Sequence, residues 1–435
     1  MPRTSAPPAV DLTTGRARAA FRKPSAVLSL AAAVCLVAAG CGGSDDTTSG
    51  ATDTATTAAT ASTDGDVQAV ADAANAFITS LDDDQKALAV LEMTEENATA
   101  WSNLPCGQEC RGGVPLADLS EDQQVLAEEL LEAATGSGEA GYQQVEEIRA
   151  ADDYLNELQE TGQGGGPGSG TMPTGMPTGM PTDGAMPSGM PSGMPTDGTR
   201  PSGMPTGGAM PGGGGGGDGY GSGLYDLAIL GTPGADGTWM LHFGGHHLAV
   251  NFTYADGEVS GASPYFVGVE PLTWTADDGT TYAPLQEMAD SVKAVTASLS
   301  EEELAQAELT ETFSDVLVGP GEDGQFPEAQ SGVKVGDLTD EQKQLVLAAI
   351  RSWVGIVDDA VAEDLMATYE SELDDTYVSW SGGTELTEHA DYVRIDGPSV
   401  WIEFVCQNGI VLSDQIHYHT VYRDKVRDYG GEFSS

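Results

Sequence analysis

Two different spacings of apolar residues alternate along the chain, and they predict two kinds of element. Short runs rich in β-branched and aromatic residues follow each helical block, separated by turn signals such as Ala255-Asp-Gly257. The stretches with helical spacing are 75–93, 119–134, 142–158, 284–318 and 338–369. The predicted strands are 224–230, 239–243, 247–254 and 265–269, then 377–380, 392–395, 400–406 and 417–422.

The helix-then-strand order occurs twice, and the sequence repeats with it. Residues 113–123 parallel residues 332–342, and both stretches end in a helix-capping pattern. The strand regions align at a constant offset of 152 residues, which places Phe243 on Ile395. We therefore expect an internally duplicated α+β fold, in which each half is a helical block followed by a small antiparallel sheet.

One half alone would bury little core, so we expect both halves to pack as one domain over 71–161 and 224–433. The stretch between them, 162–223, consists mainly of Gly, Pro, Met, Thr, Ser and Asp, and predicts a disordered insert. Its eight methionines suggest Cu(I) binding, because thioethers are soft ligands. A flexible loop of expanded repeats is the interpretation we favour, because no His or Cys joins the run.

Residues 1–40 have the pattern of an export signal. Basic residues precede an apolar run over 25–40, which is shorter than the ~20 residues that a membrane-spanning helix needs. Small residues end this run directly before Cys41, as in a bacterial lipobox, so Cys41 is the predicted lipidation site. Two acyl chains, palmitate among them, would suffice for stable anchoring. A plain secretory signal is the alternative. Residues 41–70 are small and polar and predict a flexible tether.

Charge and export restrict the partners of the chain. It has 17 basic and 68 acidic residues and a formal net charge of −51, which repels nucleic acid and anionic headgroups. We expect no nucleic-acid partner, and an extracytoplasmic location with the cell membrane contacted through the lipid anchor. Outside the cytoplasm, Cys106 and Cys110 are candidates for a disulfide, with a two-thiol metal site as the alternative. Cys406 lies in an apolar run and predicts a core thiol.

Four of the six histidines stand in two tight pairs, His246-His247 and His417-X-His419. In the second pair both side chains point to one face of a strand, a common arrangement for two imidazole ligands. Adjacent strand residues face opposite ways, so at most one of His246 and His247 should reach the same site. The two pairs fall at non-equivalent places in the repeat, which favours one composite site at the junction of the halves.

Four further residues are polar or charged within apolar strand patterns, and a buried Glu is costly unless it is paired or binds a ligand. These candidate catalytic residues are Asn251, Arg394, Glu403 and Arg423. Three interpretations compete. One is a metal site for a divalent Zn, Cu or Fe ion, with His417, His419 and one of His246 or His247 as ligands. In that site Glu403 would be a fourth ligand or the general base. The second is a metal-free pocket for an anionic or sugar-like ligand. The third is a set of structural histidines with a buried Arg–Glu pair.

Several short motifs occur together in the chain. They resemble the DUF3500 family, exported proteins of unknown function, over about residues 75–160 and 224–433. The resemblance implies that both histidine pairs, Asn251, Glu403 and Arg423 belong to a family pattern, and it implies no activity. The insert and the Cys106 region depart from that pattern. The motifs are Trp101-Ser-Asn103-Leu-Pro105, Arg111-Gly-Gly113, Gly231-Thr-Pro233, Phe243-Gly-Gly-His246-His247-Leu-Ala-Val-Asn251, Tyr392-Val-Arg394-Ile-Asp-Gly397-Pro398, Ile402-Glu403, His417-Tyr-His419, Arg423-Asp424 and Asp428-Tyr-Gly430.

The sequence thus predicts a surface lipoprotein that is a metal-dependent enzyme, either a hydrolase or an oxidoreductase. A non-enzymatic lipoprotein that binds a ligand or a metal is the alternative. Convergence of the ring nitrogens of His417, His419 and one of His246 or His247 within ~4–5 Å would distinguish a metal site from scattered histidines.

Overall fold

The computed structural model describes residues 64–162 and 219–433. The predicted export signal, Cys41, most of the tether and most of the insert lie outside the described residues. The described segments belong to one compact unit. None of the helices described is both long and apolar enough to cross a bilayer.

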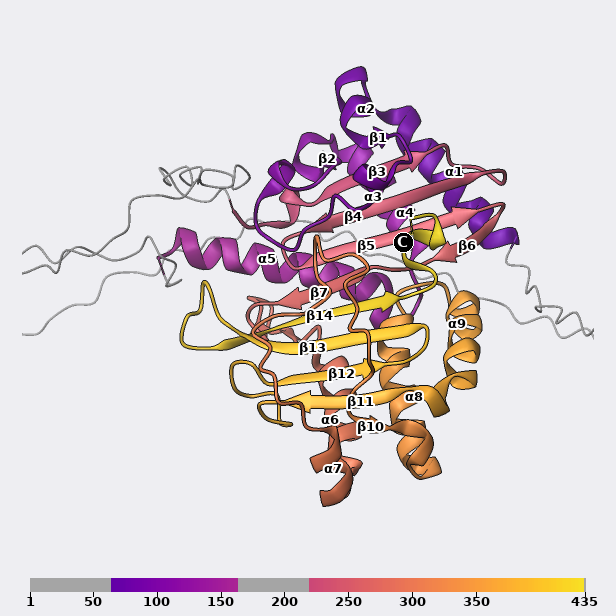
Figure 1. Cartoon of the computed structure of the whole chain (residues 1–435). Coiled ribbons are helices and arrows are strands. Elements are labelled where there is room, and N and C mark those ends of the chain that lie inside the picture. Colours follow the sequence, from indigo (N-terminus) through magenta and orange to yellow (C-terminus); the bar gives the residue numbers. More distant parts are fainter. Residues whose placement is uncertain (1–63, 163–218, 434–435) are drawn as a thin grey trace, which may run out of the picture. The chain divides into compact units, whose positions relative to one another are not determined.

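Within the described residues, twelve strands form one mixed sheet (Figure 1). Its order is β1-β3-β4-β5-β7-β14-β13-β12-β11-β10, with β2 added beside β3 and β6 beside β5. The strands are β1 (Val90–Leu91), β2 (Val114–Pro115), β3 (Asp226–Gly231), β4 (Thr238–Gly245), β5 (Leu248–Ala255), β6 (Glu258–Gly261), β7 (Tyr265–Val269), β10 (Val333–Lys334), β11 (Tyr377–Ser381), β12 (Tyr392–Asp396), β13 (Val400–Asn408) and β14 (Ile416–Asp424). A separate hairpin joins β8 (Trp274–Thr275) to β9 (Thr281–Tyr282).

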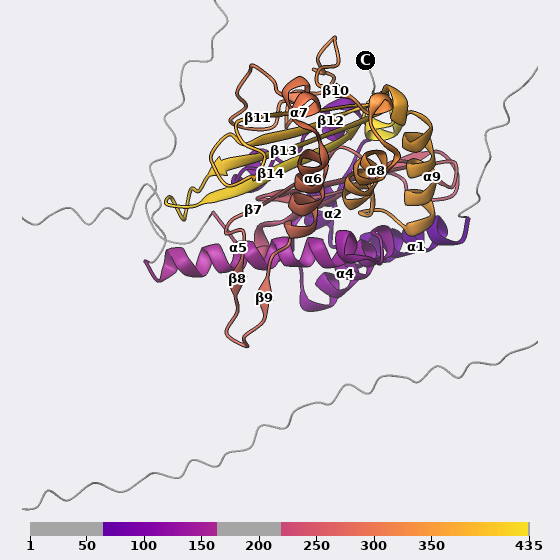
Figure 2. The same cartoon turned by 90° about the horizontal axis from the view of Figure 1, so that it is seen from below.

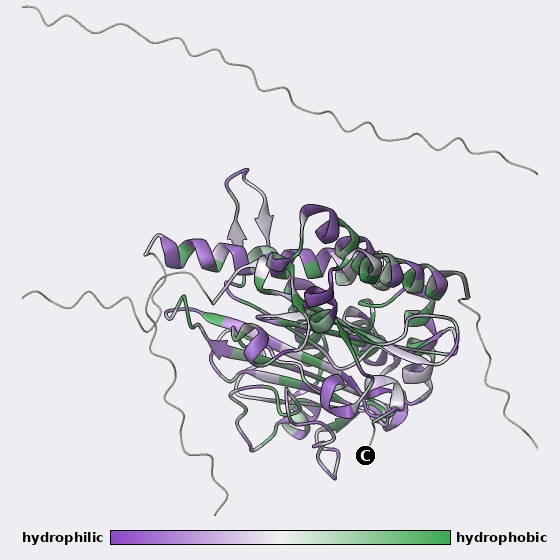
Figure 3. Ribbon diagram, turned by 90° about the horizontal axis from the view of Figure 1, so that it is seen from above, coloured by the Kyte–Doolittle hydropathy of each residue, from purple (hydrophilic) through white to green (hydrophobic). Residues whose placement is uncertain are grey.

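Helices cover one face of this sheet, as the turned view shows (Figure 2). Their apolar sides and every second strand residue form the main core, to which α4, α5, α6, α8 and α9 all contribute. The helices are α1 (Asp64–Ser80), α2 (Asp83–Ala89), α3 (Glu95–Ala98), α4 (Glu121–Ala134), α5 (Gln144–Glu160), α6 (Gln286–Ser298), α7 (Glu301–Ala307), α8 (Asp340–Val354) and α9 (Asp359–Ser371). Hydrophobic residues are concentrated along the strands of the sheet (Figure 3).

Irregular segments and the short helix α3 cover the other face, which we call the loop face. Because strand side chains alternate, the residues between the core positions of each strand point to the loop face. On β5, for example, Val250 and Phe252 belong to the main core, so Asn251 points away from the helices. A second, smaller core on the loop face includes Trp101 and Tyr429.

The mixed α+β class predicted from the sequence is confirmed, but the strands form one sheet instead of two small ones. The sheet is continuous because β7 pairs antiparallel with β14 over five residues, Tyr265 to Val269. The helix predicted over 75–93 is two helices, because Asp82 caps a new helix and forms a capping box with Gln85.

The stretch expected to be helical over 284–318 holds two helices, α6 and α7, and its helical part ends at Ala307. The residues after it, 308–330, cross the loop face without helix or strand. That segment supplies several partners of the candidate site residues. Cys406 is a fully buried core thiol as predicted, and Cys106 and Cys110 are joined in a disulfide.

Candidate metal centre

His246 and His247 form the whole turn between β4 and β5, because Gly245 and Leu248 are already paired across the hairpin. His247 adopts a left-handed backbone with a φ of 65°, which a residue other than glycine holds only when its surroundings fix it. Two backbone hydrogen bonds do so here. The amide of His247 donates to the carbonyl of Asn103 at 3.1 Å, and the amide of Gly268 donates to the carbonyl of His247 at 2.7 Å.

His417 and His419 lie two residues apart on β14, and both point to the loop face as their spacing predicted. Their Nε2 atoms are 3.1 Å apart. Two nitrogens bound tetrahedrally to one zinc ion, each at the usual Zn–N distance, lie about 3.3 Å from each other. The observed separation therefore fits two imidazoles aimed at one ion.

His247 completes the group. One ligand atom from each of His247, His417 and His419 lies within 4.8 Å of the others, and these three buried histidines could hold a metal ion. The ring centroid of His247 is 5.2 Å from that of His417 and 5.1 Å from that of His419. The structure therefore brings together the second histidine pair and one member of the first.

Burial keeps His247 and His417 neutral. The exposed fractions of His247, His417 and His419 are 5%, 1% and 6%. Burial, followed by the neighbouring histidines, lowers the pKa of His417 to about 3 and holds the pKa of His247 well below its ordinary value. A neutral imidazole is the form that binds metal, so neither ring has to lose a proton at neutral pH to become a ligand.

Asp315, in the segment that crosses the loop face, orients His419. Its Oδ1 lies 3.0 Å from Nδ1 of His419. Burial would raise the pKa of Asp315, but the hydrogen bond and charge of His419 outweigh it and lower that pKa. An ionised carboxylate on Nδ1 leaves Nε2 of His419 free to bind metal, which is the usual carboxylate–histidine–metal arrangement.

Gly268 on β7 makes room for the rings. A Cβ at this position would lie 2.9 Å from Cδ2 of His247 and 2.9 Å from Cδ2 of His419. No side chain fits there without moving both rings. The close approach of β7 to the histidines therefore requires glycine.

His246 lies beside this group with a different partner. Its ring stacks on His247 at 3.7 Å, and its Nδ1 lies 2.6 Å from Oδ1 of Asp152 on α5. Its carbonyl accepts a hydrogen bond from the hydroxyl of Tyr225 at 2.6 Å. The prediction treated the pair as strand residues facing opposite ways, whereas the two residues form a turn, and only His247 joins the convergent group.

Glu403 is fully engaged by hydrogen-bond donors. Its Oε1 accepts from the amide of Leu317 at 2.6 Å and from the hydroxyl of Tyr392 at 2.8 Å. Its Oε2 accepts from the amide of Val318 at 2.9 Å and from Nε1 of Trp401 at 2.9 Å. Burial raises the pKa of Glu403 despite these donors. Glu403 therefore anchors the segment that carries Asp315.

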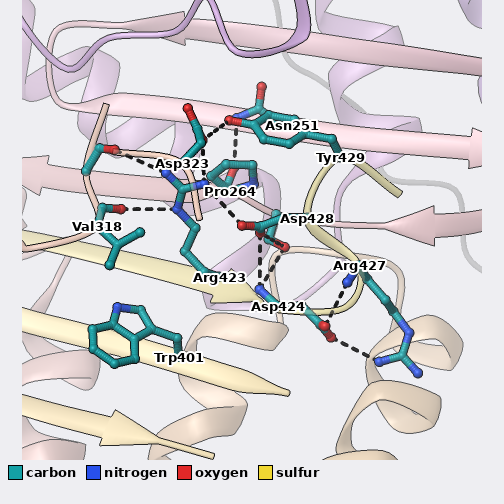
Figure 4. Close-up of polar contacts among 12 residues, drawn as sticks. Asn251, Pro264, Val318, Asp323, Trp401, Arg423, Asp424, Arg427, Asp428 and Tyr429 are labelled. Atoms are coloured by element: carbon teal, nitrogen blue, oxygen red, sulfur yellow. Dashed lines mark hydrogen bonds and ion pairs between the residues drawn. The ribbon is translucent and has the colours of Figure 1, made fainter. Parts of the chain in front are cut away.

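Arg423 anchors the same segment from β14 (Figure 4). Its guanidinium donates to the carbonyls of Val318 and Gly319, each at 3.1 Å. It also pairs with Asp323 at 2.7 Å and Asp428 at 3.1 Å. Burial alone would lower the pKa of Arg423, but the charges of Asp428 and Asp323 raise it above its ordinary value.

The other two candidate catalytic residues also point to the loop face but do not join the histidines. Nδ2 of Asn251 donates to the carbonyl of Pro264 at 2.7 Å, as Figure 4 shows. The guanidinium of Arg394 lies 5.1 Å from the centre of the Trp401 ring. Of the single histidines, His389 is exposed and His242 is buried on β4.

Sequence reasoning missed Asp315, Asp152 and Gly268. Asp315 fell in a stretch expected to be helical, and no local pattern links it to His419, which is 104 residues away. Gly268 carried a usable signal, because an isolated glycine within an apolar strand marks a bulge or a close approach.

Comparison with known proteins identifies a family for this chain. A family model described as "Protein of unknown function (DUF3500)" matches residues 63–431. Neither the curated proteins nor the solved structures gave a match.

Proposed function

Because the chain belongs to the DUF3500 family, whose function is unknown, we propose a function from its own site. The protein is a metal-dependent enzyme, a hydrolase or an oxidoreductase, that uses one divalent transition metal held by His247, His417 and His419. The observation that carries this proposal is the convergence of three buried imidazoles within 4.8 Å.

The donor set favours zinc, with copper and iron as the other candidates. Three protein ligands that leave one position for water or substrate are typical of catalytic zinc sites. A metal in such a site supplies a Lewis acid and a water whose pKa is near neutrality. The residues of the chain then have separate roles. Asp315 fixes the tautomer of His419, while Glu403 and Arg423 fix the segment that holds Asp315.

One observation favours a second function, a lipoprotein that binds a metal or ligand without catalysis. Glu403 was the expected general base, but its two oxygens already accept four hydrogen bonds. Without Glu403 as a general base, the site suits storage or presentation of the metal better than hydrolysis.

Cobalt(II) substitution separates the two functions. In the purified full-length chain loaded with Co(II), we expect the intense visible bands of a four- or five-coordinate site, and azide should change them by entering an open position. Bands that azide leaves unchanged would indicate a closed site and the binding function. Weak bands of octahedral cobalt would contradict a three-histidine centre altogether.

We also propose export and lipid anchoring at the cell membrane, supported by the lipobox that ends at Cys41. Radiolabelled palmitate fed to a bacterial host should enter the protein, and a Cys41→Ser variant should take up none. Equal labelling of the two would contradict lipidation at Cys41.

The internal duplication is a further proposal. Strands related by the offset of 152 residues occupy mirrored places in the sheet, since β3-β4-β5-β7 leads to the centre and β14-β13-β12-β11 leads away from it. In a crystal structure the two sets of strands should superpose at that offset. A best superposition at another offset would contradict the duplication.

A further inference from the structure

Arg394 is a buried cation that lacks a counter-ion. It lies in the middle of β12 on the loop face and is 3% exposed. No carboxylate of the described residues pairs with it, and its Nε has no hydrogen-bond partner among them. An unpaired charge is expensive to bury, so a group that neutralises Arg394 would recover a large desolvation cost.

The two acidic side chains that neighbour Arg394 in the strand register have other partners. Glu403 is paired in register with Arg394 on the neighbouring strand, but its oxygens accept from Leu317, Val318 and two aromatic side chains. Asp396, two residues along β12, binds Nζ of Lys425 at 2.6 Å. The protein therefore has acids close to Arg394 in the strand pairing, yet neither of them forms an ion pair with it.

Two serines on the neighbouring strand β11 lie on the same face as Arg394, and their hydroxyls are also unsatisfied. Ser379 on β11 is paired directly opposite Arg394, which places their Cβ atoms about 4.5–5.5 Å apart. Ser381 lies two residues farther along β11, on the same face. Ser379 and Ser381 are 0% and 2% exposed, and neither hydroxyl has a hydrogen-bond partner in the part of the chain that the structure describes.

We infer that Arg394, Ser379 and Ser381 form a binding site for a small oxyanion, and that a carboxylate fits it best. The guanidinium and the two hydroxyls can all donate hydrogen bonds, and the guanidinium offers a planar fork that matches a carboxylate. The Trp401 ring lies 5.1 Å from the guanidinium carbon, so the ring covers one face and leaves the edge with Nε for the anion. This site is independent of the histidines and of the metal proposed for them.

The test measures anion binding to the purified full-length chain by calorimetry and thermal unfolding. Acetate, inorganic phosphate and chloride are compared at constant ionic strength, with acetamide as the neutral analogue of acetate. We expect acetate to bind and to raise the unfolding temperature, with weaker effects of chloride and none of acetamide. Stronger binding of phosphate than of acetate would support the oxyanion site but assign it to a phosphate group.

Three variants locate the binding. Arg394→Met keeps the length of the side chain and should abolish acetate binding, and without anion it should be at least as stable as the wild type. The double change Ser379→Ala with Ser381→Ala alters no charge and should weaken acetate binding about tenfold. Arg351→Met, at an exposed position of α8, is the control for losing one positive charge and should bind acetate like the wild type.

Several outcomes would overturn the proposal. One is a wild-type chain that binds neither acetate nor phosphate. Another is a folded Arg394→Met variant that still binds acetate as the wild type does. If Arg394→Met does not fold, acetate binding by the serine double variant that equals wild-type binding also contradicts the site.

Discussion

A single methyl group at Gly268 should disturb the metal centre. In Gly268→Ala the new Cβ would lie 2.9 Å from Cδ2 of His247, 2.9 Å from Cδ2 of His419 and 2.9 Å from the carbonyl oxygen of Tyr418. Non-bonded carbon atoms prefer separations of roughly 3.5–4.0 Å. Each ring must therefore move by about 0.6 Å or more, or β7 must move away from both.

The size of the effect follows from the tolerance of metal coordination. Metal–ligand distances are held to within about 0.2 Å, so a ring displaced by about 0.6 Å no longer reaches the ion in its preferred geometry. We expect the zinc dissociation constant to rise by about 10- to 100-fold, which corresponds to roughly 1.4–2.7 kcal/mol of binding free energy. Overpacking should also lower the free energy of unfolding by roughly 1–3 kcal/mol.

Zinc affinity is measured by competition with a chromophoric chelator, alongside thermal unfolding of the same samples. Gly234→Ala is the matched control, because a Cβ there meets nothing within 4 Å and the backbone has no positive φ. The reasoning is refuted if folded Gly268→Ala binds zinc as tightly as Gly234→Ala and the wild type. That result would mean that His247 and His419 do not converge over Gly268.

Three further predictions follow from the same contacts. Asp315→Asn removes the charge that orients His419, so zinc affinity should fall about tenfold, and an unchanged affinity in the chelator assay would count against that role. Burial is the main cause, and the charge of Arg111 the second, that lowers the pKa of His242 to about 4. The neutral form of His242 therefore contributes stability that is complete above pH ~6.5 and is lost as the pH falls from there to the folded-state pKa of about 4. Urea unfolding of the wild type should therefore lose up to about 3 kcal/mol more than His242→Phe between pH 7 and pH 4, whereas parallel pH profiles would contradict this. Chelation with EDTA should remove about 4 kcal/mol of stability at zinc concentrations near 1,000 times the dissociation constant, and an EDTA effect of equal size in His417→Ala would rule out the histidine centre as its source.

Local signals made much of the fold predictable. The capping boxes at Ser120 and Thr339 start α4 and α8 where the sequence indicated. Each of the eight predicted strand ranges overlaps an observed strand, and these strands are β3, β4, β5, β7, β11, β12, β13 and β14. The single sheet was not predictable in this way, because the pairing of β7 with β14 joins residues far apart in the sequence, such as Val267 and Thr420.

The candidate site, like the fold, was predictable only where local rules apply. Period-two spacing placed His417 and His419 on one face, since that follows from strand geometry alone. The backbone partners of Glu403 and the partners of Arg423 come from residues 317–323 and 428, and no local rule brings the segment 317–323 over the sheet. Sequence could therefore flag these residues as buried and polar, but could not tell an anchor for a loop from a catalytic group.

The most direct test of the histidine centre is the metal content of the full-length chain after loading with zinc and desalting against a weak chelator. We expect about one zinc per wild-type chain, the stoichiometry of a single three-ligand site. His389→Ala, a histidine variant at an exposed position, should also retain one. His417→Ala and His247→Ala should each lose the ion while remaining folded. Zinc-free wild-type protein, or a His417→Ala variant that retains a full equivalent, would contradict the metal centre.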